Sequence, residues 1–375
     1  MKNDMNNVND VHKSSQMADA VPPTGSRPVR TGSRILVAVI AVALVVAVLA
    51  LSRLDTWGER ADATPRRFEL DLQEQAEIPP ELVAYVQRAQ FETALERPQA
   101  LTTSADGTIL VAGDQAVVRL SSAGEVLATI PLDQTPTCLA VEPATTDESG
   151  RIYVGCRRQV LVLDGTGQAI GAWPDFGPQA VLTAIAVGGQ RVFVADAGQR
   201  VVHVLDREGR PAGQIGTVDP DRSMPGFVIP SAYFDLAVGP DETLWVVNPG
   251  MRRIESYSFT GELQSLWGRA GADVAGFFGC CNPAHLALLP DGRFVTSEKG
   301  IPRIKVYSES GEFQHVVVGA RGLGVRASSL VDARGESVAR VFDVAVAPDG
   351  AILVLDAFER CVRVFYPKGA EGPQS

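Results

Sequence analysis

The feature that most constrains the fold is a sequence unit that returns six times between residues 97 and 367. Each copy has a turn rich in Gly, Asp or Ser that leads into a short apolar, β-branched run, which is typical of a tight β-hairpin. A second apolar run follows each copy and a third precedes it. The repeat therefore predicts a four-stranded antiparallel meander, with strands a, b, c and d in chain order. The six copies are Ala105–Gly113, Ser149–Cys156, Gly188–Asp196, Asp241–Asn248, Asp291–Glu298 and Asp349–Asp356.

The spacing of the turns indicates how the meanders assemble. Successive turns from Asp106 to Asp349 are 43, 40, 52, 50 and 58 residues apart. Four-stranded units at roughly 40–50 residues are typical of β-propeller blades. We therefore expect an all-β, six-bladed β-propeller over residues 84–369, with 370–375 as a short tail. The sixth repeat ends after strand c, so the segment Ala84–Leu95 is expected to supply its fourth strand and close the ring, because an open ring would leave sheet edges unpaired.

The repeats resemble those of NHL-type propellers over about residues 97–367. The resemblance lies in a Pro-Asp-Gly turn, an apolar run that ends in an acidic or amide residue, and an Arg a few residues later. The first two repeats depart from it, with Gly113 and Cys156 at the acidic position, and the Asn-His-Leu triplet is missing. The resemblance implies loops that present a face to a protein, carbohydrate or small ligand, without fixing one chemistry. The pairs that carry it are Asp196…Arg200, Asn248…Arg252, Glu298…Arg303 and Asp356…Arg360.

A single uncharged apolar run, Ile35–Leu51, lies between Arg34 and Arg53. Its seventeen residues are at the short end of the range for a spanning helix, about 17–25. The run exceeds the usual signal-peptide core and follows a long polar segment, which favours an uncleaved signal anchor over a cleaved signal peptide. Five basic residues in 1–34 predict that this segment stays in the cytoplasm, and its Asn, Ser, Pro and Gly content predicts a disordered tail. We expect one transmembrane helix (35–51), a juxtamembrane stalk (52–83) and a single-pass protein of the inner membrane with a periplasmic C-terminal domain.

Partners follow from charge and topology. A formal net charge of −10 argues against nucleic acid, whose binders present basic patches. In a meander, the d–a loops and the b–c loops share one face, and the d–a loops are the long ones here, so this face is the expected binding face. The acidic residues on it either position a ligand or tie strand b to strand c, and both readings stay open. The candidate ligand-binding residues on it are Asp196, Asn248, Cys280, Cys281, His285, Glu298, Lys299 and Asp356.

The stretch FGCCNPAH, at 278–285, has three interpretations. The two cysteines shape a tight loop, form a vicinal disulfide or redox pair, or bind a metal ion with His285. A vicinal disulfide is strained, because adjacent Cα atoms lie about 3.8 Å apart and bridged ones usually about 4.4–6.8 Å. Thiolates with imidazole favour zinc or copper, with Glu298 or Cys156 as a further ligand. However, Cys-Cys-x3-His is not a standard zinc spacing. The sequence does not identify a cofactor, and a metal ion is one candidate.

Catalytic motifs are missing from the sequence. It contains no G-x-S-x-G, P-loop, H-E-x-x-H or dinucleotide fingerprint. This favours a binding or scaffold module for a protein or small ligand over an enzyme. The alternative is a propeller enzyme or electron-transfer component, since some similar propellers are lyases or lactonases with a metal ion in the channel. For that, ligands would have to converge at the axis, where the inner strands offer chiefly Asp235, His285 and Asp343.

Overall fold

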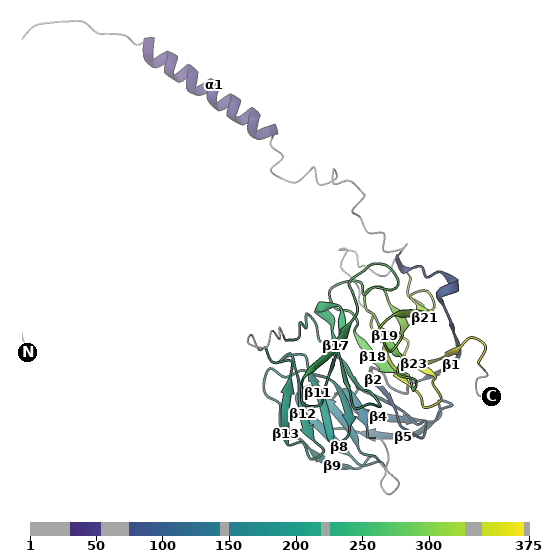
Figure 1. The fold of residues 1–375 in the computed structure, drawn as a ribbon. Helices are drawn as coiled ribbons and strands as arrows, with labels where there is room; N and C mark the ends of the chain where they lie inside the picture. The colour runs from purple at the N-terminus through teal and green to yellow at the C-terminus, as the bar shows by residue number, and fades with distance from the viewer. Residues whose placement is uncertain (1–30, 54–74, 143–149, 219–225, 327–339, 371–375) are drawn as a thin grey trace, which may run out of the picture. The chain divides into compact units, whose positions relative to one another are not determined.

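The structure, a computed structural model, describes residues 31–53, 75–142, 150–218, 226–326 and 340–370 (Figure 1). It divides into two compact units, 1–69 and 70–375. In the first unit, helix α1 spans Thr31–Arg53. Among the described residues, no helix is found that is long and apolar enough to cross a membrane, so the predicted anchor is not confirmed. The predictions for residues 1–30, 54–74 and 371–375 lie outside the described residues.

The second unit contains six sheets, each of four antiparallel strands, and these are the blades of a β-propeller. This confirms the predicted all-β, six-bladed architecture. Blade 1 contains β2 (Pro98–Thr103), β3 (Ile109–Gly113), β4 (Ala116–Leu120) and β5 (Val126–Pro131). Blade 2 contains β6 (Pro136–Val141), β7 (Ile152–Cys156), β8 (Val160–Leu163) and β9 (Ala169–Ala172). Blade 3 contains β10 (Leu182–Gly188), β11 (Arg191–Asp196), β12 (Val201–Asp206) and β13 (Pro211–Ile215).

The second half of the ring repeats this order. Blades 4 and 5 are formed by β14 (Leu236–Val238), β15 (Leu244–Asn248), β16 (Arg253–Tyr257) and β17 (Leu263–Trp267), and by β18 (His285–Leu288), β19 (Phe294–Ser297), β20 (Arg303–Tyr307) and β21 (Phe313–Gly319). Blade 6 contains β22 (Asp343–Val346), β23 (Ile352–Asp356), β24 (Cys361–Pro367) and β1 (Tyr85–Glu92). Two short 3-10 helices, η3 (Pro80–Leu82) and η4 (Pro249–Met251), complete the described elements of this unit.

Strand β1 closes the ring. It pairs antiparallel with β24, from Tyr85 opposite Pro367 to Glu92 opposite Cys361, and lies beside the C-terminal strands in Figure 1. The backbone amide of Lys368 also donates to the carbonyl of Ala84, which extends the pairing beyond the strand. The outer strand of the last blade therefore comes from the N-terminal side of the domain, within the segment Ala84–Leu95 that the sequence analysis selects.

Burial explains why strand b is largely apolar. In β3, β7, β19 and β23 every residue is buried, because both faces of each sheet pack against a neighbouring blade. The outer strands differ, and all four residues of β9 are exposed. Strand b thus reads as a mostly apolar run, whereas an outer strand d such as β9 is exposed.

A repeated contact joins several successive blades. Trp267, at the end of β17, lies on the c–d turn of blade 5, where a Cβ on Gly311 would come within 2.3 Å of the indole Cγ. Gly311 also has a positive φ of 81°, so both its space and its conformation require glycine. Phe91 of β1 lies in the same way against Gly124 of blade 1. Strand β1 therefore provides both the hydrogen bonds and the apolar contact of a regular outer strand.

We predict that the propeller depends on β1. Deleting Tyr85–Glu92 should unfold the domain or lower its Tm by more than about 10 °C, because β24 and the turn at Gly124 lose their partners. Thermal melting followed by circular dichroism measures this. As a control, the same eight residues placed after Ala370 can form a hairpin with β24, and this chain should melt close to the parent. Parent-like melting of the simple deletion would contradict the closure.

Candidate functional site

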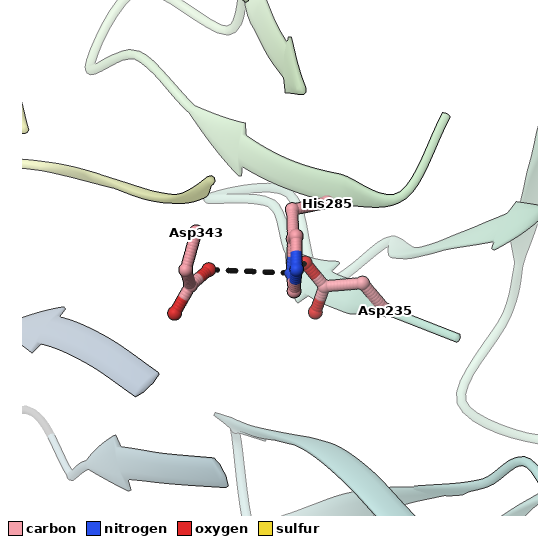
Figure 2. Close-up of side chains that lie close together, drawn as sticks. All are labelled: Asp235, His285 and Asp343. Carbon is pink, nitrogen blue, oxygen red and sulfur yellow. Dashed lines mark ion pairs between the residues drawn. The ribbon is translucent and has the colours of Figure 1, made fainter. Parts of the chain in front are cut away.

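The inner strands of all six blades line a central cavity of about 270 Å³. Three ionisable side chains meet there, Asp235 just before β14, His285 at the start of β18 and Asp343 at the start of β22 (Figure 2). All three stand where a d–a loop enters strand a, so they lie at the end of the channel that opens toward the long loops. Three different blades thus each contribute one group to one point.

The imidazole of His285 lies between the two carboxylates. Its Nδ1 is 3.3 Å from Oδ2 of Asp235 and 3.3 Å from Oδ1 of Asp343. The three potential ligand atoms all lie within 4.8 Å of one another, and the side chains are 14–18% exposed. Within the described part of the chain, this is the group of three or more His, Cys, Asp or Glu residues that could hold a metal ion.

The two carboxylates also join neighbouring blades. Oδ2 of Asp343 accepts the backbone amide of Leu101 in blade 1 at 2.7 Å, and Oδ2 of Asp235 accepts that of Leu286 in blade 5 at 2.9 Å. Their other oxygens accept the amide of the following residue, Val344 or Leu236. These bonds fix the carboxylates in place, and each oxygen keeps a second lone pair for a ligand.

The three side chains of the cluster shift one another's pKa values because they lie close together. Burial acts to lower the pKa of His285, but the charges of Asp343 and Asp235 outweigh it and raise this pKa. Burial raises the pKa of Asp343 to about 6, against the opposing effect of His285. The imidazolium form of His285 therefore neutralises part of the carboxylate charge when no cation is bound.

The cysteine loop adjoins this cluster. All five cysteines lie in described segments and are unbonded; Cys280 is exposed and Cys281 is buried, with their sulfurs 3.1 Å apart. Lys299 lies beside them, with Nζ 4.8 Å from the ring centroid of Tyr233. The Tyr233 ring in turn meets the His285 ring edge-on at 6.1 Å. Tyr233 thus connects the cysteine loop to the channel cluster.

The structure does not assemble the predicted metal set of Cys280, Cys281 and His285. His285 turns its Nδ1 to Asp235 and Asp343, and neither cysteine belongs to the group of ligand atoms that could share an ion. The physical reason is the position of His285 at the first residue of an inner strand, which directs its side chain into the channel. We therefore assign the cysteines and His285 to two adjoining sites.

The predicted residues at the ends of the b strands are fully buried. Asp196, Asn248, Glu298 and Asp356 are each 0% exposed. Asp196 accepts the amides of Val181 and Gln199, so it holds the preceding d–a loop as well as its own turn. These contacts fit the alternative in which such residues tie strands and loops together.

The partners of these residues differ from the expected arginines. Arg200, Arg252 and Arg360 have left-handed backbones with φ of 60°, 55° and 55°, so they form the b–c turns. The contact is made instead by the residue seven positions after the acid or amide, on strand c. These partners are His203 for Asp196, Glu255 for Asn248, Lys305 for Glu298 and Arg363 for Asp356. Arg303 alone of the four expected arginines pairs with its acid, Glu298.

Glu298 is the centre of a buried ionic cluster. It lies 3.0 Å from Arg303 and 2.7 Å from Lys305, and all three side chains are 0% exposed. Burial lowers the pKa of Lys305 to about 8, although Glu298 opposes this. Glu298 also accepts the amide of Phe278, and Lys305 donates to the carbonyl of Gly276. The cluster therefore holds the d–a loop that leads to Cys280.

We predict that Glu298→Gln destabilises the domain by about 3–5 kcal/mol, because it leaves two buried cations without a counter-charge. Asp291→Asn is the matched control: it removes an exposed ion pair with Arg293, and the expected loss is below about 1 kcal/mol. Urea unfolding of both variants measures the difference. Equal unfolding free energies would show that the buried cluster does not hold the loop.

Sequence reasoning missed Ser231 and Tyr233. The Nζ of Lys299 donates to Oγ of Ser231 at 3.1 Å, and Ser231 also lowers the pKa of the Cys281 thiol. Both residues end the d–a loop before β14, on the same face as the cysteines, which was the one signal available. Asp235 and Asp343 could be placed at the axis from the repeat, although their convergence on His285 could not.

Comparisons with known proteins add the fold and little else. No protein-family profile and no curated protein matches the chain. Among solved structures, one titled "Streptogramin B lyase structure" aligns with a TM-score of 0.51 and 14% identity, over 76% of this chain and 98% of that one. A virginiamycin B lyase from Staphylococcus aureus aligns with a TM-score of 0.50 and 11% identity, over 75% and 99%. At these identities the likeness supports the propeller fold alone.

Proposed function

We propose that the protein is a ligand-binding propeller that holds a divalent cation at Asp235, His285 and Asp343, through which it binds a small ligand entering from the long-loop face. The observation that carries this is the convergence of three ligand atoms from three blades at the mouth of the channel. The missing catalytic motifs favour binding over catalysis.

The geometry of the cluster suits a small cation. Two of the ligand-to-ligand distances are 3.3 Å, which is about the edge of a tetrahedron whose centre lies about 2.0–2.2 Å from each corner. Two carboxylates with one imidazole suit a divalent transition metal such as Mn²⁺ or Zn²⁺. Three protein ligands leave coordination positions open toward the cavity, where a small ligand could complete the shell.

Similarity to two lyases supports the propeller fold and does not indicate a reaction. Their titles name streptogramin B and virginiamycin B lyases, and both align over most of their length. Because the identities are 14% and 11%, we do not transfer a substrate. We also propose that the propeller is of the NHL type. It is supported by the left-handed b–c turns at Arg200, Arg252 and Arg360, which recur at the same place in three blades.

We predict that the full-length chain binds one Mn²⁺ per molecule. Mn²⁺ is a more specific probe of this site than Zn²⁺ because, as a hard cation, it binds the nearby thiols only weakly. Asp343→Asn should weaken binding at least about tenfold, since it replaces an anionic ligand with a neutral one, while the amide oxygen still accepts a backbone N–H. Isothermal titration calorimetry and the Mn²⁺ electron paramagnetic resonance signal measure the affinity.

Asp241→Asn is the control for this experiment. Asp241 is an exposed acceptor in the a–b turn of blade 4, where it bonds Thr243, and its loss should leave Mn²⁺ affinity unchanged. Melting temperatures of both variants establish that they are folded. Absence of stoichiometric Mn²⁺ in the parent, or equal affinities for the two variants, would refute the proposed cation site.

We further propose that α1 anchors the protein in the inner membrane, with the propeller in the periplasm. Support comes from the run Ile35–Leu51 and its flanking arginines. Apolar side chains of α1, among them Leu36, Val42 and Val48, are more than half exposed. A helix that is apolar all round needs an apolar environment to cover it.

For the anchor, we predict an N-in, C-out topology. Alkaline phosphatase fused after Ser375 should be active, because it folds in an oxidising compartment, and the intact chain should stay in the membrane fraction. Replacing Val42 and Val45 with Arg should release the chain from the membrane fraction, whereas Val42→Leu with Val45→Leu should not. Recovery of a shortened chain that begins near Leu51 would show a cleaved signal peptide instead.

A further inference from the structure

We propose that Cys280 and Cys281 form a reversible dithiol–disulfide pair, in which exposed Cys280 attacks a low-molecular-weight disulfide and buried Cys281 resolves the product. This inference is independent of the cation proposed for the channel, since neither cysteine belongs to that cluster.

The two sulfurs are already placed for exchange. They lie 3.1 Å apart, and either can donate a proton to the other. Cys280 is exposed to solvent, whereas Cys281 is only 4% exposed. An incoming disulfide can therefore reach Cys280 but not Cys281, and the resolving sulfur is in place without a movement of the loop. The other three cysteines, Cys138, Cys156 and Cys361, are buried.

A cation and a hydroxyl stabilise the buried sulfur as a thiolate. Lys299 and Ser231 are bonded to each other at 3.1 Å, and both act on Cys281 to lower its pKa. Burial acts to raise the pKa of Cys281, but these groups and Cys280 outweigh it and lower this pKa. The hydrogen bond to Cys281 and burial raise the pKa of Cys280. Loss of one proton from the pair thus leaves a charge that the two sulfurs share across their contact.

The loop is built to keep these groups together. Asn282 donates to the carbonyl of Lys299 at 2.9 Å and accepts its amide at 2.8 Å, and it also donates to the carbonyl of Phe278. Asn282 is 1% exposed. The amide side chain therefore clamps the cysteine loop to the turn that carries Lys299, which fixes the distance between the ammonium and the thiol pair.

The exchange balances in two steps. Once the pair has lost one proton, Cys280 passes its own proton to the Cys281 thiolate across their 3.1 Å contact and attacks one sulfur of the small disulfide. An S–S bond forms to Cys280, the original S–S bond breaks, and one small thiolate leaves. Cys281 then loses its proton to solvent and attacks the Cys280 sulfur, the protein S–S bond forms, and the second small thiolate leaves. The two protein thiols lose two electrons and two protons, and the small disulfide becomes two thiols.

The product disulfide is easily reduced again. Adjacent Cα atoms lie about 3.8 Å apart, below the usual range of about 4.4–6.8 Å, so the bond is strained. Strained, exposed disulfides have more oxidising potentials and belong to the labile class. The pair is therefore suited to reversible exchange and unsuited to a structural bridge.

The test is intact-mass spectrometry of the reduced full-length chain after incubation with oxidised glutathione and acid quenching. The parent should lose the mass of two hydrogens and keep no glutathione on the peptide with Cys280 and Cys281. Cys281→Ser should trap a mixed disulfide on Cys280, and Cys280→Ser should react slowly because Cys281 is buried. Cys156→Ser, a change at another buried thiol, is the matched control and should behave as the parent.

Substitutions of Lys299 test the redox role of the loop separately from its structural role, because they change the rate at which the mixed disulfide is resolved. Lys299→Met should slow resolution about three- to tenfold, so that the mixed disulfide accumulates, because the thiolate population of Cys281 falls. Lys299→Arg should restore most of the rate, and melting temperatures confirm that both variants are folded. The proposal is overturned if the folded parent retains glutathione on Cys280, as Cys281→Ser is expected to do. It is equally overturned if neither cysteine of the folded parent reacts.

Discussion

The ring depends on one contact repeated around it, in which an apolar side chain from the outer strand of one blade covers the c–d turn of the next. Trp267 on Gly311 and Phe91 on Gly124 are two instances, and Ile130 on Gly167 and Trp173 on Gly209 follow the same plan. These four turns leave no room for a Cβ, so blades 1, 2, 3 and 5 are each positioned by the preceding blade. The channel and its three-blade cluster exist only because this angular relation is kept from blade to blade.

The propeller could be predicted from the sequence because each blade is specified by residues that are close together in the chain. Turn glycines, apolar runs and their spacing define each meander, and a missing fourth strand in the last repeat requires β1 to complete it. The pairing of charged side chains was less accessible. Arg200 and Arg360 stand close in sequence to Asp196 and Asp356, yet their left-handed backbones make them turn residues. The actual partners, His203 and Arg363, depend on the register between strands b and c.

The candidate site shows the same limit. The repeat places Asp235, His285 and Asp343 at equivalent positions of three blades, but a repeat does not say that one imidazole reaches both carboxylates. Nor does it show that each carboxylate binds the backbone of the following blade, at Leu286 or Leu101. The cysteine loop was visible as a motif, whereas Ser231 and Tyr233 carry no motif and became neighbours only through folding.

The origin of blade 6 has a consequence for how the protein is made. Strand β1 is synthesised before any blade, and its partner β24 is almost the last segment of the domain, roughly 280 residues later. At about 5–20 residues per second, a ribosome needs about 15–60 s to cover that distance. Throughout this interval the nascent chain carries a strand without a partner and an arc of blades with two open ends. Native closure is therefore a single late event that joins the oldest part of the domain to the youngest.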